Sequence, residues 1–126
     1  MDITPQVPRD AQVIQRYGPG RFTIAGETYR GSVLVTPIAV AAWPAAGTPD
    51  QWQETDLRPI HQLTPLPELL LVGTGSTMAL LPKALRVALK ARGIGCDVMD
   101  TGAACRTYNI LLAEGRRVAA VLVAVD

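Results

Sequence analysis

The chain has 126 residues, of which 48% are hydrophobic, and its formal net charge is +1. This length suits one domain with a buried core, and the hydrophobic content excludes a disordered protein. Because acidic and basic residues are interspersed and no basic block occurs, the composition argues against binding to nucleic acid. Residues 31–49 carry no charge but contain three prolines, so they do not predict a membrane-spanning helix.

The first residues lack the basic and apolar segments of a secretory signal, so we expect a cytoplasmic protein. Residues 1–10 hold two prolines and little periodicity, which predicts a loose lead-in to a single domain over residues 11–126. Cys96 and Cys105 lie in apolar strand and helix patterns, so we interpret them as reduced core thiols rather than a disulfide or metal pair. No metal-ligand spacing occurs, and no cofactor is expected.

Short strand and turn patterns fill the first part of the domain. Residues 13–17 end at a Gly-Pro-Gly turn, residues 21–25 alternate polar and apolar side chains, and residues 28–35 follow a Gly-Glu turn. These patterns predict an N-terminal antiparallel hairpin. Residues 38–43 predict a further strand and residues 54–63 a short helix, which prolines end before the next apolar run.

The second half predicts the order β-α-β-α-β. The apolar run at residues 69–72 breaks at a glycine loop and indicates a strand buried on both faces. A helix, a strand, a helix and a strand then follow, over residues 82–92, 94–100, 101–114 and 118–125. The last of these strands has no polar residue and is expected to be central, whereas Asp97 indicates that its strand lies at an edge. Right-handed crossovers place the last strand beside the first, and the hairpin can complete the other side.

The glycine loop Gly73-Thr74-Gly75 has two interpretations. It follows a strand, and Asp100 ends the next strand, as in dinucleotide-binding folds. However, Met78 stands where such folds need a third glycine, and Pro82 delays the helix, so a tight structural loop is the preferred interpretation.

A ligand crevice at the carboxyl edge of the sheet is a second possibility for the same region. The amides after Gly73 and the start of the helix at Thr101 meet there, and helix N-termini favour anions. The candidate binding residues are Gly73, Gly75, Ser76, Thr101 and Asn109. The structural alternative is that Thr101 only caps its helix.

The sequence contains no recognisable catalytic motif, and no catalytic residue is assigned. His61 lies in a proline-rich segment and is interpreted as a surface histidine, while Ser76 lacks the surroundings of a nucleophile elbow. Asn109 is unusual inside a helix, so either its amide satisfies a neighbouring backbone, which we favour, or it lines a small pocket. Arg116 and Arg117 start the last strand, at the opposite end of the sheet from the glycine loop.

Three segments carry a family resemblance: residues 71–75, residues 93–101 and residues 104–118, with the pattern T-x-x-A-x-x-x-Y-N-x-L from Thr101 to Leu111 as its specific part. The hairpin at residues 22–33 fits as well. The chain resembles the small α/β-domain family that includes mitochondrial respiratory complex I assembly factor 3, an adipogenesis-associated domain protein and many uncharacterised bacterial members.

The resemblance implies a three-layer α/β fold with a mixed central five-stranded sheet in the order 2-1-5-3-4. It also implies a non-enzymatic protein-interaction module, an assembly or biogenesis factor for a membrane or respiratory complex with an unidentified protein partner. No nucleic acid and no membrane insertion are expected, and homo-oligomerisation stays open. The alternative is a small-molecule or anion-binding protein, with or without enzymatic activity, that uses the carboxyl-edge crevice.

Overall fold

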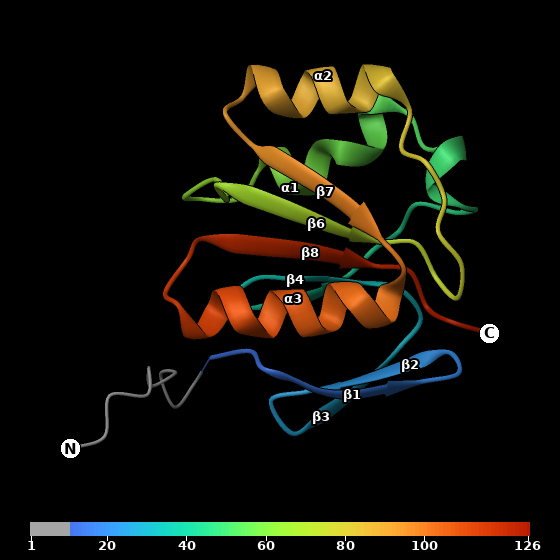
Figure 1. Ribbon diagram of the computed structural model, residues 1–126, viewed down its shortest axis with the longest axis vertical. Coiled ribbons are helices and arrows are strands. Elements are labelled where there is room, and N and C mark those ends of the chain that lie inside the picture. The colour runs from blue at the N-terminus through green and yellow to red at the C-terminus, as the bar shows by residue number, and fades with distance from the viewer. Residues whose placement is uncertain (1–10) are drawn as a thin grey trace.

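A computed structural model describes residues 11–126, whose strands form two sheets (Figure 1). The larger sheet is mixed and runs in the order β5-β4-β8-β6-β7, with bounds Val40–Ala42, Val33–Val35, Val118–Leu122, Leu69–Gly73 and Gly95–Met99. β6 pairs in parallel with β7 and β8, whereas β4 pairs antiparallel with β5 and β8. Numbered along the chain within this sheet, the order is 2-1-5-3-4, which confirms the predicted topology. The predicted lead-in of residues 1–10 lies outside the described residues.

The N-terminal strands form a separate antiparallel sheet of three strands, β1 (Ile14–Gly18), β2 (Arg21–Ile24) and β3 (Glu27–Arg30). Here the sequence-based expectation was wrong in two respects. Residues 28–35 are not one strand, because Gly31 turns the chain with a φ of 82° and divides them between β3 and β4. For the same reason β4 with β5, not the hairpin, completes the larger sheet.

The helices lie on the two faces of the larger sheet and give the predicted three layers (Figure 1). α3 (Thr101–Ala113) covers one face and also contacts β1, while α2 (Lys83–Ala91) lies across the other face with α1 (Arg58–His61). The short helix predicted over residues 54–63 is present as a 3-10 helix, η2 (Glu54–Leu57), that continues directly into α1.

The core between α3 and the two sheets follows strand and helix periodicity. Phe22 and Ile24 of β2 are fully buried, and they join Val35, Leu122 and Tyr108 in one cluster. Alternate residues of the large-sheet strands belong to this cluster, and their neighbours belong to the cluster on the opposite face. The large sheet is therefore apolar on both sides.

The core under α2 contains a stripe of leucines that begins just before the helix. Leu81, Leu85 and Leu89 are all buried at one-turn spacing. Trp43 and Trp52 belong to the same core, and their ring centroids lie 5.3 Å apart. Both are 4% exposed, and neither indole N–H has a hydrogen-bond partner among residues 11–126.

His61 differs from the expected surface histidine, because it is half-buried at the end of α1. Its Nε2 atom is buried and has no hydrogen-bond partner in the described part of the chain. Burial is the main cause that lowers the pKa of His61, and the charge of Arg92 lowers it further. The fold therefore favours a neutral imidazole.

We expect the free energy of unfolding to fall as the pH is lowered from about 7.5 to about 5.5. The folded pKa of His61 lies below its unfolded value of about 6.5, so the unfolded chain binds the proton first. The contribution of the neutral His61 side chain to the free energy of unfolding is therefore fully present above its unfolded pKa. It is lost as the pH falls toward the folded pKa. Urea unfolding of His61→Gln should give a flatter profile over this range, and identical profiles for both proteins would contradict the assignment.

Candidate functional site

The glycine loop is built into the junction between β6 and the start of α3. A Cβ atom on Gly73 would lie 3.0 Å from Cα of Thr101 and 3.1 Å from Cβ of Ala104, so the absence of a side chain lets the two elements approach closely. Gly75 follows in the left-handed region with a φ of 95°. These two glycines have direct structural roles.

Thr101 connects the loop to the end of β8, and it is fully buried. Its hydroxyl accepts a hydrogen bond from the amide of Gly75 at 2.8 Å and donates one to the carbonyl of Val123 at 2.7 Å. The expected capping role belongs instead to Asp100, whose side chain accepts from the amide of Ala103 at 2.9 Å. The carboxylate of Asp100 thus compensates the positive helix end where an anion was predicted.

The five predicted binding residues divide into groups. Gly73, Gly75 and Thr101 lie together, and Ser76 is exposed in the same loop. Asn109 lies eight residues further along α3, a rise of about 12 Å. Ligand binding at the loop stays a prediction, although the Gly75 amide is already occupied within the fold.

Asn109 holds the backbone of β1. Its Oδ1 accepts from the amide of Ile14 at 3.0 Å, and its Nδ2 donates to the carbonyl of the same residue at 2.7 Å. The preceding residue, Tyr108, is buried, and its hydroxyl donates to the carbonyl of Gln12 at 3.0 Å. The favoured structural role of Asn109 is therefore confirmed.

The two cysteines are both free thiols, as expected. Burial raises the pKa of Cys96 to about 11 and that of Cys105 to about 12. A thiol with so high a pKa is protonated at neutral pH and is a poor nucleophile or metal ligand.

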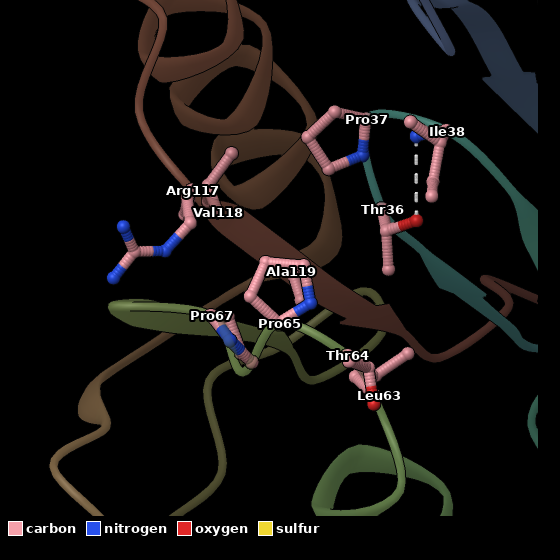
Figure 2. A pocket seen from close by; sticks show the side chains of 10 residues that line it. All are labelled: Thr36, Pro37, Ile38, Leu63, Thr64, Pro65, Pro67, Arg117, Val118 and Ala119. Atoms are coloured by element: carbon pink, nitrogen blue, oxygen red, sulfur yellow. Dashed lines mark hydrogen bonds between the residues drawn. The ribbon is translucent and has the colours of Figure 1, made fainter.

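A pocket that the sequence did not predict lies at the opposite end of the parallel strands (Figure 2). It has a volume of about 220 Å³ and is lined mainly by apolar side chains. Pro37, Pro65 and Pro67 form much of its wall, together with Val118 and Ala119 at the start of β8. Three prolines give this wall few internal rotations, so the pocket is preformed.

Ile38 is the exposed apolar residue beside this pocket, and its exposed fraction is 80%. It lies in the turn between β4 and β5, where the Thr36 side chain accepts from the amides of Ile38 at 3.4 Å and Ala39 at 3.1 Å. A second hollow of about 370 Å³ shares Pro37, Ile38 and Arg117 with the pocket. We call this combined area, from Pro65 across Ile38 to Arg117, the Ile38 surface.

Two arginines give the Ile38 surface a positive rim. Arg116 pairs with Glu68, with 2.9 Å between Nε and Oε1, and this hydrogen bond is the main cause that lowers the pKa of Glu68. Arg117 instead donates from Nε to the carbonyl of Leu66 at 3.4 Å, and it has no ion pair within residues 11–126. Figure 2 shows its guanidinium extending outward from the pocket. As predicted, these arginines lie far from the glycine loop, because β8 runs between them.

The prolines that form the Ile38 surface are visible in the sequence, but their pattern there indicated only the ends of strands and helices. Pro37, Pro65 and Pro67 were used only as strand and helix breakers. That they share one wall depends on the pairing of β4 with β8, which brings residues far apart in the chain together.

These features define a three-layer mixed α/β domain. The chain belongs to the family described as proteins of unknown function DUF498/DUF598, whose model matches residues 14–123. No helix among residues 11–126 is both long and apolar enough to cross a membrane.

Similar proteins come from bacteria and vertebrates. An uncharacterised protein of Rhodobacter capsulatus is 44% identical over 109 residues, which cover 86% of this chain and 82% of that protein. NADH dehydrogenase [ubiquinone] 1 alpha subcomplex assembly factor 3 of Danio rerio is 38% identical over 111 residues, with 88% of this chain and 63% of the relative covered. The chain thus spans less than two thirds of that assembly factor.

A solved structure with the same fold is described as an outer membrane protein from Bartonella henselae. It is 38% identical in sequence and superimposes with a TM-score of 0.81. The match covers 96% of this chain and 100% of that one.

The first prediction for the site concerns Thr101→Val, which keeps the shape of the side chain but removes its hydroxyl. The Gly75 amide and the Val123 carbonyl would each lose a buried partner, at about 1–3 kcal/mol per group. We expect a clearly lower urea midpoint. Thr107→Val is the matched control on the same helix, because within residues 11–126 the one hydrogen bond of its hydroxyl goes to the Met99 sulfur at 3.6 Å. Equal midpoints for the two variants would refute this role of Thr101.

The second prediction concerns Asn109→Ala. Removal of the amide leaves both main-chain groups of Ile14 without their partner, at about 1–3 kcal/mol, while the better helix propensity of alanine returns up to about 0.7 kcal/mol. We expect net destabilisation in urea. Ile110→Ala, at an exposed neighbour, is the control. A midpoint of Asn109→Ala at or above that of the parent would contradict the structural role.

Proposed function

We propose that this chain is a non-enzymatic protein-interaction module that serves the assembly or biogenesis of a membrane or respiratory complex. The observation that carries the proposal is the Ile38 surface: an 80% exposed isoleucine between two hollows, beside a pocket with proline walls. Relatives named as assembly factors of the NADH dehydrogenase [ubiquinone] 1 alpha subcomplex support the biological role. Two free thiols support work in the cytoplasm, where cysteines stay reduced.

The chemistry of the Ile38 surface specifies a type of partner segment. A volume of about 220 Å³ accommodates one large apolar side chain, and burying such a side chain contributes about 1.5–3 kcal/mol. The guanidinium of Arg117, which has no ion pair among the described residues, favours a carboxylate nearby. The preferred partner therefore presents an apolar side chain next to an acidic residue.

The alternative, a small-molecule or anion-binding protein, has less support from the same residues. Ligand pockets usually measure about 300–1,000 Å³ and contain several convergent polar groups. The pocket beside Ile38 is smaller and mostly apolar, and at the carboxyl edge the Gly75 amide is bound to Thr101.

Site-specific photocrosslinking tests the proposal. With p-benzoyl-phenylalanine in place of Ile38, we expect one reproducible protein adduct in native cell extract, competed by excess unlabelled parent protein. The variant Ile38→Asp should compete poorly, because it places a charge in the apolar contact. The same photoreactive residue in place of Ile110, exposed on α3, is the matched control.

Two outcomes count against the interaction module. One is the same set of adducts from positions 38 and 110, and the other is competition by Ile38→Asp as effective as that by the parent. A metabolite that raises the melting temperature of the parent, with no discrete adduct at position 38, would favour the small-molecule alternative.

A further inference from the structure

The charges of the chain are segregated on α2, although acids and bases are interspersed overall. Residues 69–96 contain Lys83, Arg86, Lys90 and Arg92 but no aspartate or glutamate. All four cations are exposed on or directly after α2, and none forms an ion pair within residues 11–126. The outer side of this helix is therefore a cationic face.

The strand next to this helix has an unpaired edge. β7 pairs only with β6 among the described strands and is the last strand of its sheet. The amide of Gly95 bonds to the Glu68 carbonyl, and the Met99 carbonyl accepts from the Thr74 amide, so both residues direct their main chains toward β6. Because the period of a strand is two, Cys96 and Val98 direct their amides and carbonyls outward.

Cations and strand edge meet at one hollow. It has a volume of about 460 Å³ and is lined by Arg86, Lys90 and residues 93–96. Cys96 and Val98 pack with the α2 core, whereas Met99 packs with the α3 core, so Asp97 also faces away from α2. The side of the edge next to Arg86 and Lys90 thus carries no acidic residue from β7.

We propose that the edge of β7 accepts an extended acidic segment of a partner protein as an added strand, with its carboxylates on the α2 side facing Arg86 and Lys90. The main-chain groups of Cys96 and Val98 supply the ladder bonds, and the two cations select the sequence. Strand addition of this kind obtains affinity from main-chain bonds and specificity from alternate side chains. The inference rests on the proposed interaction function but concerns a surface separate from Ile38.

Charge argues against a second copy of the chain as the added strand. An antiparallel pair of β7 strands about a two-fold axis would put both α2 helices on the same face of the joined sheet. Arg86 and Lys90 of the two copies would then approach one another, and the two Asp97 side chains would approach on the opposite face. Like charges across paired strands are destabilising, so an acidic partner segment fits better.

The test uses a capped peptide of about ten residues that alternates glutamate and valine, so that a strand places all carboxylates on one side. Binding to the full chain is measured by fluorescence anisotropy at low ionic strength. We expect the double variant R86E/K90E to weaken binding at least about tenfold, which corresponds to about 1.4 kcal/mol. The matched control, R16E/R30E, makes the same change in net charge on the exposed N-terminal sheet and should bind as the parent does.

Amide hydrogen exchange locates the bound peptide and separates strand addition from simple charge attraction. Protection of the Cys96 and Val98 amides by the peptide is the expected result, with the inward-facing amide of Asp97 as an internal reference. A peptide that alternates glutamate with proline should give no such protection, because proline cannot donate to the ladder.

Three results would overturn the inference. The first is an equal loss of binding in the two double variants. The second is that saturating peptide does not protect the Cys96 and Val98 amides from exchange. The third is that a higher protein concentration protects these amides without any peptide. The last result would assign the edge to a second copy. None of these outcomes affects the photocrosslinking test at Ile38, so failure of strand addition leaves the proposed function standing. Failure at Ile38 with strand addition intact would move the interaction function to the edge of β7.

Discussion

Complete burial of β8 is the constraint on which the rest of the fold depends. All five of its residues are 0–1% exposed, so every main-chain polar group of the strand needs a partner inside the protein. β6 pairs with all five residues on one side, β4 pairs with residues 120–122 on the other, and the Val118 amide bonds to the Arg116 carbonyl. Ala119 and Ala120 at its centre let the layers on both faces pack closely against it. The mixed direction of the sheet follows, because β4 arrives antiparallel and β6 parallel.

Two of the polar residues predicted as binding candidates, Thr101 and Asn109, instead connect the elements of this fold. Thr101 joins the loop after β6 to the chain after β8, and Asn109 joins α3 to β1. Each satisfies backbone groups that cannot pair within a regular sheet or helix, and unpaired buried groups are costly. Polar side chains at the carboxyl edge, where open α/β sheets often bind ligands, are thus engaged in holding the elements together.

Surfaces available to partners lie elsewhere and differ in chemistry. The Ile38 surface is apolar with a cationic rim, at the turn between β4 and β5. The edge of β7 offers main-chain groups next to the cations of α2. β4 and β7 are three strands apart in the sheet, a distance of about 14 Å. The two surfaces are therefore separate, and a segment on one does not block the other.

The sequence by itself determined the second half of the fold, because its signals are local. Unbroken apolar runs, a leucine stripe in α2 and glycine ends define β6, α2, β7, α3 and β8, and Asp97 identified the edge strand. Only the tertiary structure decided the division at Gly31, the structural use of Thr101 and the proline-walled pocket. In each case the deciding partner is distant in sequence: β8 for β4, Val123 for Thr101, and Pro65 for Pro37. Periodicity reports which face of an element is apolar, but which distant backbone group a side chain meets depends on how the layers pack.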